Sequence, residues 1–278
     1  MTFVEHGDPT EYALEGGDVT EGLVRIGATV RRPTVVTSEP VRRLLTGLEE
    51  LGFTGAPRHL GVDAADRHVL DFVAGEVAAR PWPAWLGDEG RLASVARLVR
   101  SYDDAALKLG LPDWSAAMLR DDPPGTPPSI AGEPQFIGHL DITPENVVFR
   151  DGAAFALIDF DLARPATRSE EVVNMLLWWA PWAPVEDREY MVSGVDPFHR
   201  AGVIVDAYGL SDEDRATIVP LARNLAERSW HLMKHRAETL GGGWARMWSE
   251  GVGDRILRRQ RWLAENETAL ERAIQRRG

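Results

Sequence analysis

Cysteine is absent from the 278 residues, which excludes disulfide bonds, thiolate zinc sites and cysteine nucleophiles. No run reaches the roughly 18 uninterrupted apolar residues that a membrane helix needs, and the first ten residues lack the basic and apolar regions of a signal peptide. The G-x-S-x-G motif of many serine hydrolases is also missing. We therefore expect a cytoplasmic protein with no membrane partner and no chemistry based on cysteine or a serine elbow.

Lysine is scarce, with two residues, Lys108 and Lys234, against 29 arginines. This bias indicates a GC-rich coding genome rather than selection at each site. The formal net charge of −12 argues against a nucleic-acid partner, because phosphate backbones are bound by basic surfaces. An acidic cleft would instead attract a cationic substrate by long-range steering, although most of this charge is expected to be solvated surface.

Length and apolar content suit a compact enzyme with a cleft. A chain of 278 residues exceeds one average domain, and 44% apolar residues suffice for a real core.

The segment 136–163 is the most informative stretch of the chain. Asp141 and Asn146 lie five residues apart across a short polar turn, and two apolar strands around Asp151-Gly152 return the chain to Asp159. Asp159 follows an apolar run, where an ionised carboxylate is unfavourable without a partner or a metal. Phosphoryl transfer needs a carboxylate near the attacking hydroxyl and oxygen ligands for Mg²⁺, and this spacing can provide both.

The motif His139-Leu-Asp141-Ile-Thr-Pro-Glu-Asn146, followed by Ile158-Asp159-Phe160-Asp161, resembles the HxDxxxxN and IDF motifs of aminoglycoside phosphotransferases, relatives of the protein kinases. The resemblance implies that Asp141 is the catalytic base and that Asn146 and Asp159 bind Mg²⁺. It also implies that His139 braces the metal-binding loop. A protein kinase is less well supported, because Leu140 replaces the expected arginine and no Ala-Pro-Glu follows.

The same resemblance implies a two-lobed, protein-kinase-like α+β fold. The N-lobe, residues 1–75, would contain the nucleotide-binding sheet and a helix, and the larger, mostly helical C-lobe would span residues 76–278. The proline-rich run at 79–85 marks the change from strand-rich to helix-rich sequence. In the C-lobe we expect a helix at 91–108, a loop at 121–133, a capping box from Thr167 to Glu170, a helix break at 241–243 and a final amphipathic run at 254–272.

The small lobe departs from the family, since no lysine precedes Lys108 to hold the α and β phosphates. Arg31 or Arg32 lies about where that lysine would sit. Strand alternation puts the two arginines on opposite faces, so one of them can point at the cleft, and the sequence does not decide which. Glu49, near the end of a helix with an apolar stripe from Val41 to Leu48, is the candidate partner of the arginine, although an exposed helix surface explains it equally well.

Two further segments are candidates for nucleotide binding. The glycine-rich turn with Gly17, Asp18 and Val19 would let backbone amides approach phosphates. Phe72 and Val73 follow a strand and resemble the hinge at which the family binds adenine through backbone groups.

The acceptor site would lie among the helices of the large lobe. Trp178, Trp179 and Trp182 could stack on a sugar or an ammonium group, although core packing is the simpler account for any one of them. Carboxylates for a cationic acceptor are available at Asp187, Glu189 or Asp196. His231 and His235 could share a helix face, but a zinc site would need a third ligand.

Together these features predict a phosphotransferase that moves the γ-phosphate of ATP, with GTP as the alternative, to a hydroxyl of a small molecule, using Mg²⁺. An aminoglycoside-like cationic sugar is the leading acceptor, which would imply a role in antibiotic resistance. The alternatives are a kinase for an amino alcohol, a sugar or homoserine, and a catalytically silent nucleotide-binding or immunity protein. The first alternative remains open because one fold serves many substrates.

Overall fold

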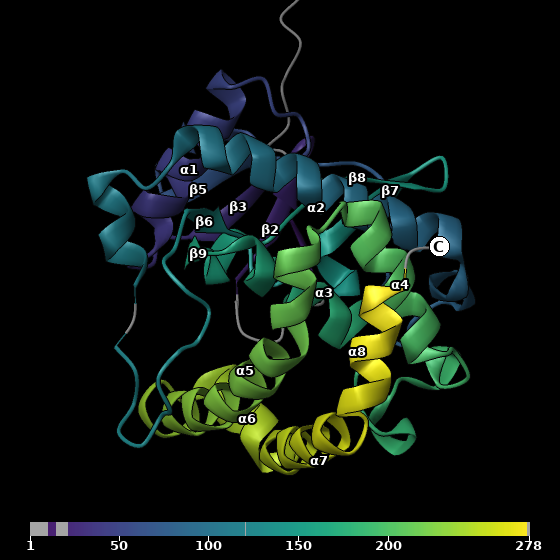
Figure 1. Cartoon of the computed structure of the whole chain (residues 1–278). Helices are drawn as coiled ribbons and strands as arrows, with labels where there is room; N and C mark the ends of the chain where they lie inside the picture. Colours follow the sequence, from purple (N-terminus) through teal and green to yellow (C-terminus); the bar gives the residue numbers. More distant parts are fainter. Residues whose placement is uncertain (1–10, 15–21, 120, 277–278) are drawn as a thin grey trace, which may run out of the picture.

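The computed structural model describes residues 11–14, 22–119 and 121–276. Near the N-terminus, five short strands form one antiparallel sheet in the spatial order β1-β2-β3-β5-β4. Figure 1 labels β2, β3 and β5 of this sheet. The strands are β1 (Glu11–Ala13), β2 (Val24–Ile26), β3 (Thr29–Pro33), β4 (His59–Val62) and β5 (Arg67–Asp71). One helix, α1 (Ser38–Glu50), lies between β3 and β4 in the chain.

Helix α1 has the predicted apolar stripe. Val41, Leu44, Leu45 and Leu48 are all buried, and Leu44 and Leu48 are 0% exposed. These positions recur at three- and four-residue intervals, so they share one face of the helix. Burial of that face holds α1 in the core and leaves Glu49 on the solvent side.

The rest of the chain is mainly helical. Its helices are α2 (Glu89–Leu109), α3 (Arg168–Trp179), α4 (Pro197–Tyr208), α5 (Asp212–Thr239), α6 (Gly242–Ser249), α7 (Val252–Glu265) and α8 (Glu267–Gln275). Two small antiparallel sheets pair β6 (Phe136–Gly138) with β9 (Arg164–Ala166), and β7 (Val147–Arg150) with β8 (Ala153–Leu157). Single 3-10 turns are η1 (Ala84–Gly87), η2 (Asp113–Met118), η3 (Pro144–Asn146), η4 (Phe160–Leu162), η5 (Val185–Asp187) and η6 (Tyr190–Val192).

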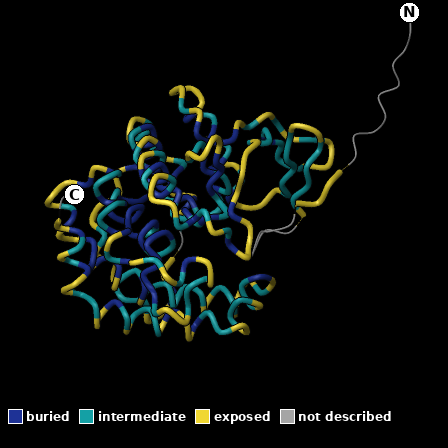
Figure 2. Tube along the Cα trace, turned by 90° about the vertical axis from the view of Figure 1, so that its right-hand side faces the viewer, coloured by how far each residue is buried: buried dark blue, intermediate teal, exposed yellow. Residues whose placement is uncertain are grey.

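Burial differs between the two parts of the molecule. Buried residues concentrate inside the helical part, whereas the N-terminal sheet is mostly of intermediate exposure (Figure 2). Leu70 is the one residue of the described strands of this sheet that is buried. A sheet that is not fully covered keeps side chains available to contact another part of the chain or a ligand. In β3, Arg32 contacts Asp159 in the helical part.

The fold class predicted from the sequence is confirmed: the protein is α+β, with an N-terminal antiparallel sheet and a helical C-terminal region. The capping box is present, because Thr167 and Glu170 bond each other's backbone amides at the start of α3. The expected helix break lies between α5 and α6. The final amphipathic run forms two helices, α7 and α8, which are separated at Asn266. The lobe boundary near Gly75 stays a prediction. No described helix combines the length and apolar character needed to cross a membrane.

Arg200 of α4 ties three segments together. It is 3% exposed, and it donates to the carbonyl oxygens of Trp179 at 2.6 Å, Leu86 at 3.0 Å and Gly87 at 3.2 Å. Burial lowers the pKa of Arg200 to about 10. The guanidinium thus donates hydrogen bonds to carbonyl oxygens at the end of α3 and in the turn η1, neither of which is adjacent to α4 in the sequence.

We expect Arg200→Met to lower the free energy of unfolding by about 2–4 kcal/mol, because buried carbonyl groups lose charged hydrogen bonds. Arg223→Met is the matched control, since Arg223 pairs with Glu267 at 2.8 Å on the surface and such pairs contribute at most about 1 kcal/mol. Urea unfolding of the two variants measures the difference. Equal losses would show that Arg200 does not hold these segments together.

Candidate active site

His139 anchors the loop that follows β6. The residue is fully buried, its Nε2 donates to the Ile158 carbonyl at 2.9 Å, and its Nδ1 accepts the Asp141 amide at 3.3 Å. Since one ring nitrogen donates and the other accepts, the imidazole is neutral, and burial lowers the pKa of His139 to about 4. These contacts agree with the predicted bracing role.

Glu171 of α3 fixes the same loop from the other side. Its buried carboxylate accepts the amides of His139 and Leu140, the latter at 3.2 Å, and Leu140 takes a left-handed conformation with φ of 57°. Burial raises the pKa of Glu171 to about 7. A side chain at Gly138 would place its Cβ 2.7 Å from Glu171 Oε1, so glycine is required there.

Asn174, one turn further along α3, completes this attachment. It accepts the Ile142 amide at 2.7 Å and donates to the Leu140 carbonyl at 2.9 Å. Neither Glu171 nor Asn174 was predicted from the sequence. The signal available was a second glutamate directly after the capping glutamate, in a position that the capping box does not need.

Asp141 and Asn146 lie in direct contact. The Asn146 amide nitrogen donates to both the Asp141 carboxylate and the Asp141 carbonyl, each at 2.9 Å. This leaves the Asn146 amide oxygen as the group that can bind a ligand. Burial, followed by the negative charge of Asp159, raises the pKa of Asp141 to about 7.

Asp159 lies at the end of the β8 strand in a left-handed conformation, with φ of 64°. Arg32 of β3 donates to Asp159 at 3.1 Å and also bonds to the carboxylate of Asp161. Arg32 therefore connects the N-terminal sheet with the segment that follows β8. Asp161 was not among the predicted site residues, although the repeated acid in Ile158-Asp159-Phe160-Asp161 was its sequence signal.

Arg31 points the other way. Its Nη1 donates to the Thr29 hydroxyl at 2.6 Å, and its Nε lies 3.4 Å from Asp63. The two arginines are therefore on opposite faces of β3, as strand alternation requires, and Arg32 is the one that reaches Asp159.

Of the two alternatives for Glu49, the structure has the exposed helix surface and not a pair with Arg31 or Arg32. The Glu49 carboxylate is about half exposed and lies 3.5 Å from Arg58. Burial of the apolar face of α1 turns Glu49 away from β3, and Arg32 pairs with Asp159 and Asp161 instead.

The structure describes two of the remaining candidates for nucleotide binding, Phe72 and Val73. Gly17, Asp18 and Val19 lie outside the described residues. The Phe72 amide donates to the Ala28 carbonyl at 2.8 Å. Val73 comes next in the chain, and three residues later Glu76 pairs with Phe149 of β7.

The predicted tryptophans differ from one another. Trp179 is 3% exposed and donates to the Ile142 carbonyl at 2.8 Å, and Trp182 is fully buried, so both are core residues. Trp178 is partly exposed, and the guanidinium carbon of Arg259 lies 5.5 Å from the centre of its ring.

The predicted acceptor carboxylates all have partners inside the protein. Asp187 accepts from Arg258 at 2.8 Å, Glu189 lies 3.5 Å from Arg80, and Asp196 caps α4 by accepting the Phe198 amide at 2.9 Å. Asp187, Glu189 and Arg258 line a cavity of about 470 Å³ between the 186–190 segment and α7.

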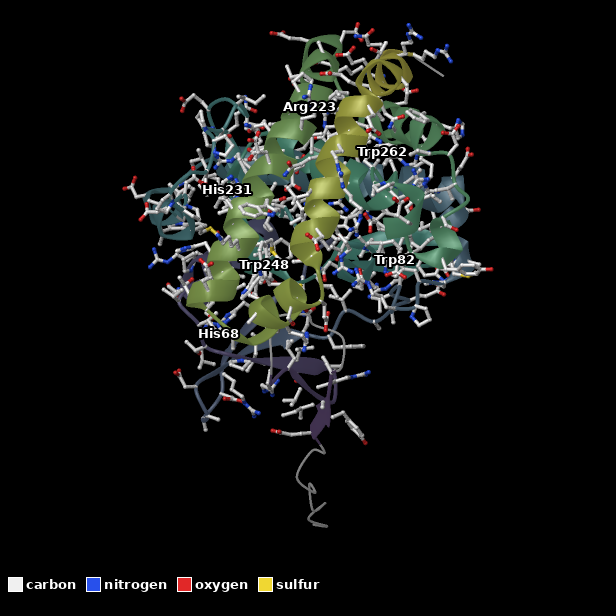
Figure 3. The ribbon with its side chains drawn as sticks, turned by 90° about the horizontal axis from the view of Figure 1, so that it is seen from below. His68, Trp82, Arg223, His231, Trp248 and Trp262 are labelled. Atoms are coloured by element: carbon white, nitrogen blue, oxygen red, sulfur yellow. The ribbon has the colours of Figure 1, made fainter. Side chains whose placement is uncertain are left out.

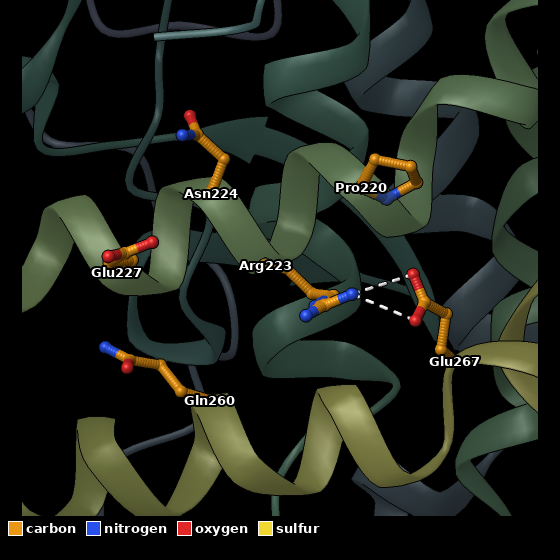
Figure 4. A pocket seen from close by; sticks show the side chains of 6 residues that line it. All are labelled: Pro220, Arg223, Asn224, Glu227, Gln260 and Glu267. Carbon is orange, nitrogen blue, oxygen red and sulfur yellow. Dashed lines mark hydrogen bonds and ion pairs between the residues drawn. The ribbon is translucent and has the colours of Figure 1, made fainter. Parts of the chain in front are cut away.

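Two other features are separate from the loop 139–146, which carries Asp141 and is the candidate catalytic loop. His231 packs edge-on against Trp230, whose ring in turn packs against Trp248. Figure 3 labels His231 and Trp248. Within the ranges that the structure describes, no group of three or more His, Cys, Asp or Glu residues is placed to hold a metal. A second cavity, of about 300 Å³, lies between α5 and α7, and an Arg223–Glu267 ion pair spans part of its wall (Figure 4).

Comparisons with known proteins agree with this geometry. Residues 24–203 match the family described as the phosphotransferase enzyme family. The trifolitoxin immunity protein of Rhizobium leguminosarum bv. trifolii is 30% identical over 226 residues, which cover 75% of this chain and 78% of that protein.

Solved structures show the same fold. A choline/ethanolamine kinase family protein from Mesorhizobium loti superposes with a TM-score of 0.56 at 15% identity, covering 97% of this chain and 93% of that one. The Plasmodium vivax ethanolamine kinase gives a TM-score of 0.55 at 12% identity, with 95% and 81% of the two chains covered.

The raised pKa of Asp141 predicts a stability that depends on pH. Between its ordinary pKa of 3.8 and about 7, the folded state keeps a proton that the unfolded chain has lost, so Asp141 lowers the free energy of unfolding as the pH rises. We expect Asp141→Asn to be more stable than the wild type by about 2 kcal/mol at pH 8. This is less than the free energy that corresponds to the whole pKa shift, because Asp141 is partly exposed and solvent screens its charge.

At pH 4.5 the two proteins should differ little, because the carboxylate is then largely protonated in the folded state. Urea unfolding in EDTA at both pH values measures this, with the exposed Asp121→Asn as control. A destabilised Asp141→Asn at pH 8 would show that the carboxylate is not electrostatically strained.

Proposed function

Because the chain belongs to the phosphotransferase enzyme family, we propose that it transfers the γ-phosphate of ATP, with GTP as the alternative, to a hydroxyl of a small molecule. The observation that carries this proposal is the contact of Arg32 with Asp159 and Asp161, which joins the sheet to the catalytic segment. In this arrangement a phosphate-binding cation, a candidate base and candidate metal ligands meet at one place.

Asp141 is the proposed base. A carboxylate with a pKa near 7 can take a proton from an attacking hydroxyl at neutral pH and release it afterwards. The hydrogen bond from Asn146 holds the carboxylate in one orientation. His139 and Glu171 hold the backbone of the loop, so that Asp141 needs little rearrangement when a substrate binds.

The donor groups fit Mg²⁺. The Asn146 amide oxygen and the Asp159 carboxylate are hard oxygen ligands of the type that Mg²⁺ prefers. When bound there, Mg²⁺ would neutralise charge on the nucleotide phosphates. Arg32 is then expected to move from Asp159 towards the phosphates, which a guanidinium can bind bidentately.

The other parts of the nucleotide site remain proposals. The turn with Gly17, Asp18 and Val19 would contact the phosphates through backbone amides. Backbone groups of Phe72 and Val73 would contact the base of the nucleotide.

The acceptor is a separate question. An aminoglycoside-like cationic sugar, with a role in antibiotic resistance, stays a prediction from the motif resemblance, and a metabolite kinase for an amino alcohol, a sugar or homoserine is the alternative. The relative with an immunity function favours a second candidate role, in which the phosphorylated hydroxyl belongs to a toxic compound. The presence of Asp141, Asn146 and Asp159 together argues against a silent nucleotide-binding protein.

Release of ADP from Mg·ATP and Mg·GTP across aminoglycosides, amino alcohols and sugars tests the transferase function. We expect release that depends on an acceptor and falls on the order of 10³-fold in Asp141→Ala, while nucleotide binding persists. The exposed Asp121→Ala should behave as the wild type. A protein that binds neither nucleotide would contradict the proposal.

The two arginines of β3 should differ in nucleotide binding. We expect Arg32→Ala to weaken Mg·ATP binding roughly 10- to 100-fold, since charged hydrogen bonds are lost, and Arg32→Lys to restore part of it. Arg31→Ala should change the affinity less than about threefold, because Arg31 faces Thr29 and Asp63. Isothermal titration calorimetry measures both. A larger effect at Arg31 would rule out Arg32 as the phosphate ligand.

A further inference from the structure

Arg259 of α7 differs from its neighbour. Arg258 forms an ion pair with Asp187 at 2.8 Å. Arg259, in contrast, has no hydrogen bond or ion pair to any residue in the described part of the chain. Its guanidinium carbon lies over the ring of Trp178, 5.5 Å from the ring centre. Both residues are of intermediate exposure.

Trp178 places this guanidinium beside the catalytic loop. Glu171, Asn174 and Trp178 are three and then four residues apart, so they lie along one face of α3. The first two bond the loop backbone at Leu140 and Ile142, and Trp178 follows one turn later, about 6 Å further along the helix. Trp179 also bonds the Ile142 carbonyl, which confirms that this end of α3 packs on the loop.

The surroundings of Arg259 favour an anion. Burial lowers the pKa of Arg259 to about 10, and the negative charge of Asp187 compensates only part of this effect. Asp187 already has its own arginine, Arg258. A partly desolvated cation without a hydrogen-bond acceptor is unfavourable, and an anionic ligand would relieve this. The three carboxylates predicted to attract a cation, Asp187, Glu189 and Asp196, are meanwhile paired with arginines or bonded to backbone amides.

We propose that the acceptor of this enzyme carries a carboxylate, which Arg259 binds while the ring of Trp178 packs against the rest of the molecule. The inference rests on the phosphotransferase function proposed above and narrows its acceptor to hydroxylated acids, including hydroxy amino acids and sugar acids. A planar guanidinium matches a carboxylate through two parallel hydrogen bonds. A hydroxyl elsewhere on the same molecule would then face Asp141.

Matched acceptor pairs test the proposal, because the members of each pair keep a hydroxyl group and differ in the carboxylate. Suitable pairs are L-homoserine with 3-amino-1-propanol, L-serine with ethanolamine, and gluconate with sorbitol. Binding is measured by calorimetry on the intact protein with Mg²⁺ and a non-hydrolysable ATP analogue, and ADP release is measured in parallel. We expect the acid of at least one pair to bind at least tenfold more tightly than its partner.

The variants locate the effect. Arg259→Gln should weaken binding of the acid roughly 10- to 100-fold and leave its neutral or cationic partner unchanged, because one charged pair is lost. Arg259→Lys should keep part of the preference. Arg261→Gln, at an exposed position of the same helix, should keep all of it. Urea unfolding of each variant separates a loss of binding from a loss of folding.

The outcomes separate this inference from the function on which it rests. The carboxylate site is contradicted if no acid binds more tightly than its partner, or if Arg259→Gln keeps the preference for the acid. Either result counts against it even when other acceptors support ADP release. Acid binding that depends on Arg259, with no ADP release from any acceptor, supports the carboxylate site and contradicts the transferase function. Acid-dependent release that is lost in Arg259→Gln supports both.

Discussion

The buried carboxylate of Glu171 is the interaction on which the site depends. It accepts the amides of His139 and Leu140 where the chain adopts a left-handed turn, and without an acceptor those amides would be buried and unsatisfied. The turn directs Asp141 towards Asn146, and Asn174 and Trp179 fix the backbone that follows. Helix α3 thus supports the loop that carries Asp141, and its capping box fixes where that helix begins.

Arginines organise the charges around this support. Arg32 joins the N-terminal sheet to Asp159 and Asp161, and Arg200 holds the end of α3. Arg258 neutralises Asp187 beside the proposed acceptor region. Among the arginines that the structure describes as buried or half-buried, Arg259 alone has no hydrogen bond or ion pair, and the proposed carboxylate site rests on this difference.

The sequence predicted features that depend on short-range patterns. The apolar stripe of α1, the capping box and the spacing of Asp141, Asn146 and Asp159 are local, and the α+β class follows from their order along the chain. Glu171, Asn174 and Asp161 bond residues far from them in the sequence. The local signals at Glu171 and Asp161 do not show which residues they contact, and all three were missed. Strand alternation separated Arg31 from Arg32, but choosing between them required the position of the sheet relative to Asp159. The sequence left two alternatives for Glu49, and the exposed one holds because the apolar face of α1 is buried and Glu49 lies outside that face.

The central claim is that Asn146, Asp159 and Arg32 form one phosphate and metal site beside Asp141. A crystal structure with Mn²⁺ and a non-hydrolysable ATP analogue tests it most directly, because the anomalous signal of Mn²⁺ locates the metal independently of the protein. The account predicts a metal peak in contact with Asn146 and Asp159, and Arg32 moved from the carboxylates to the phosphates. A bound nucleotide whose metal lies elsewhere, with Arg32 still paired to Asp159, would contradict it.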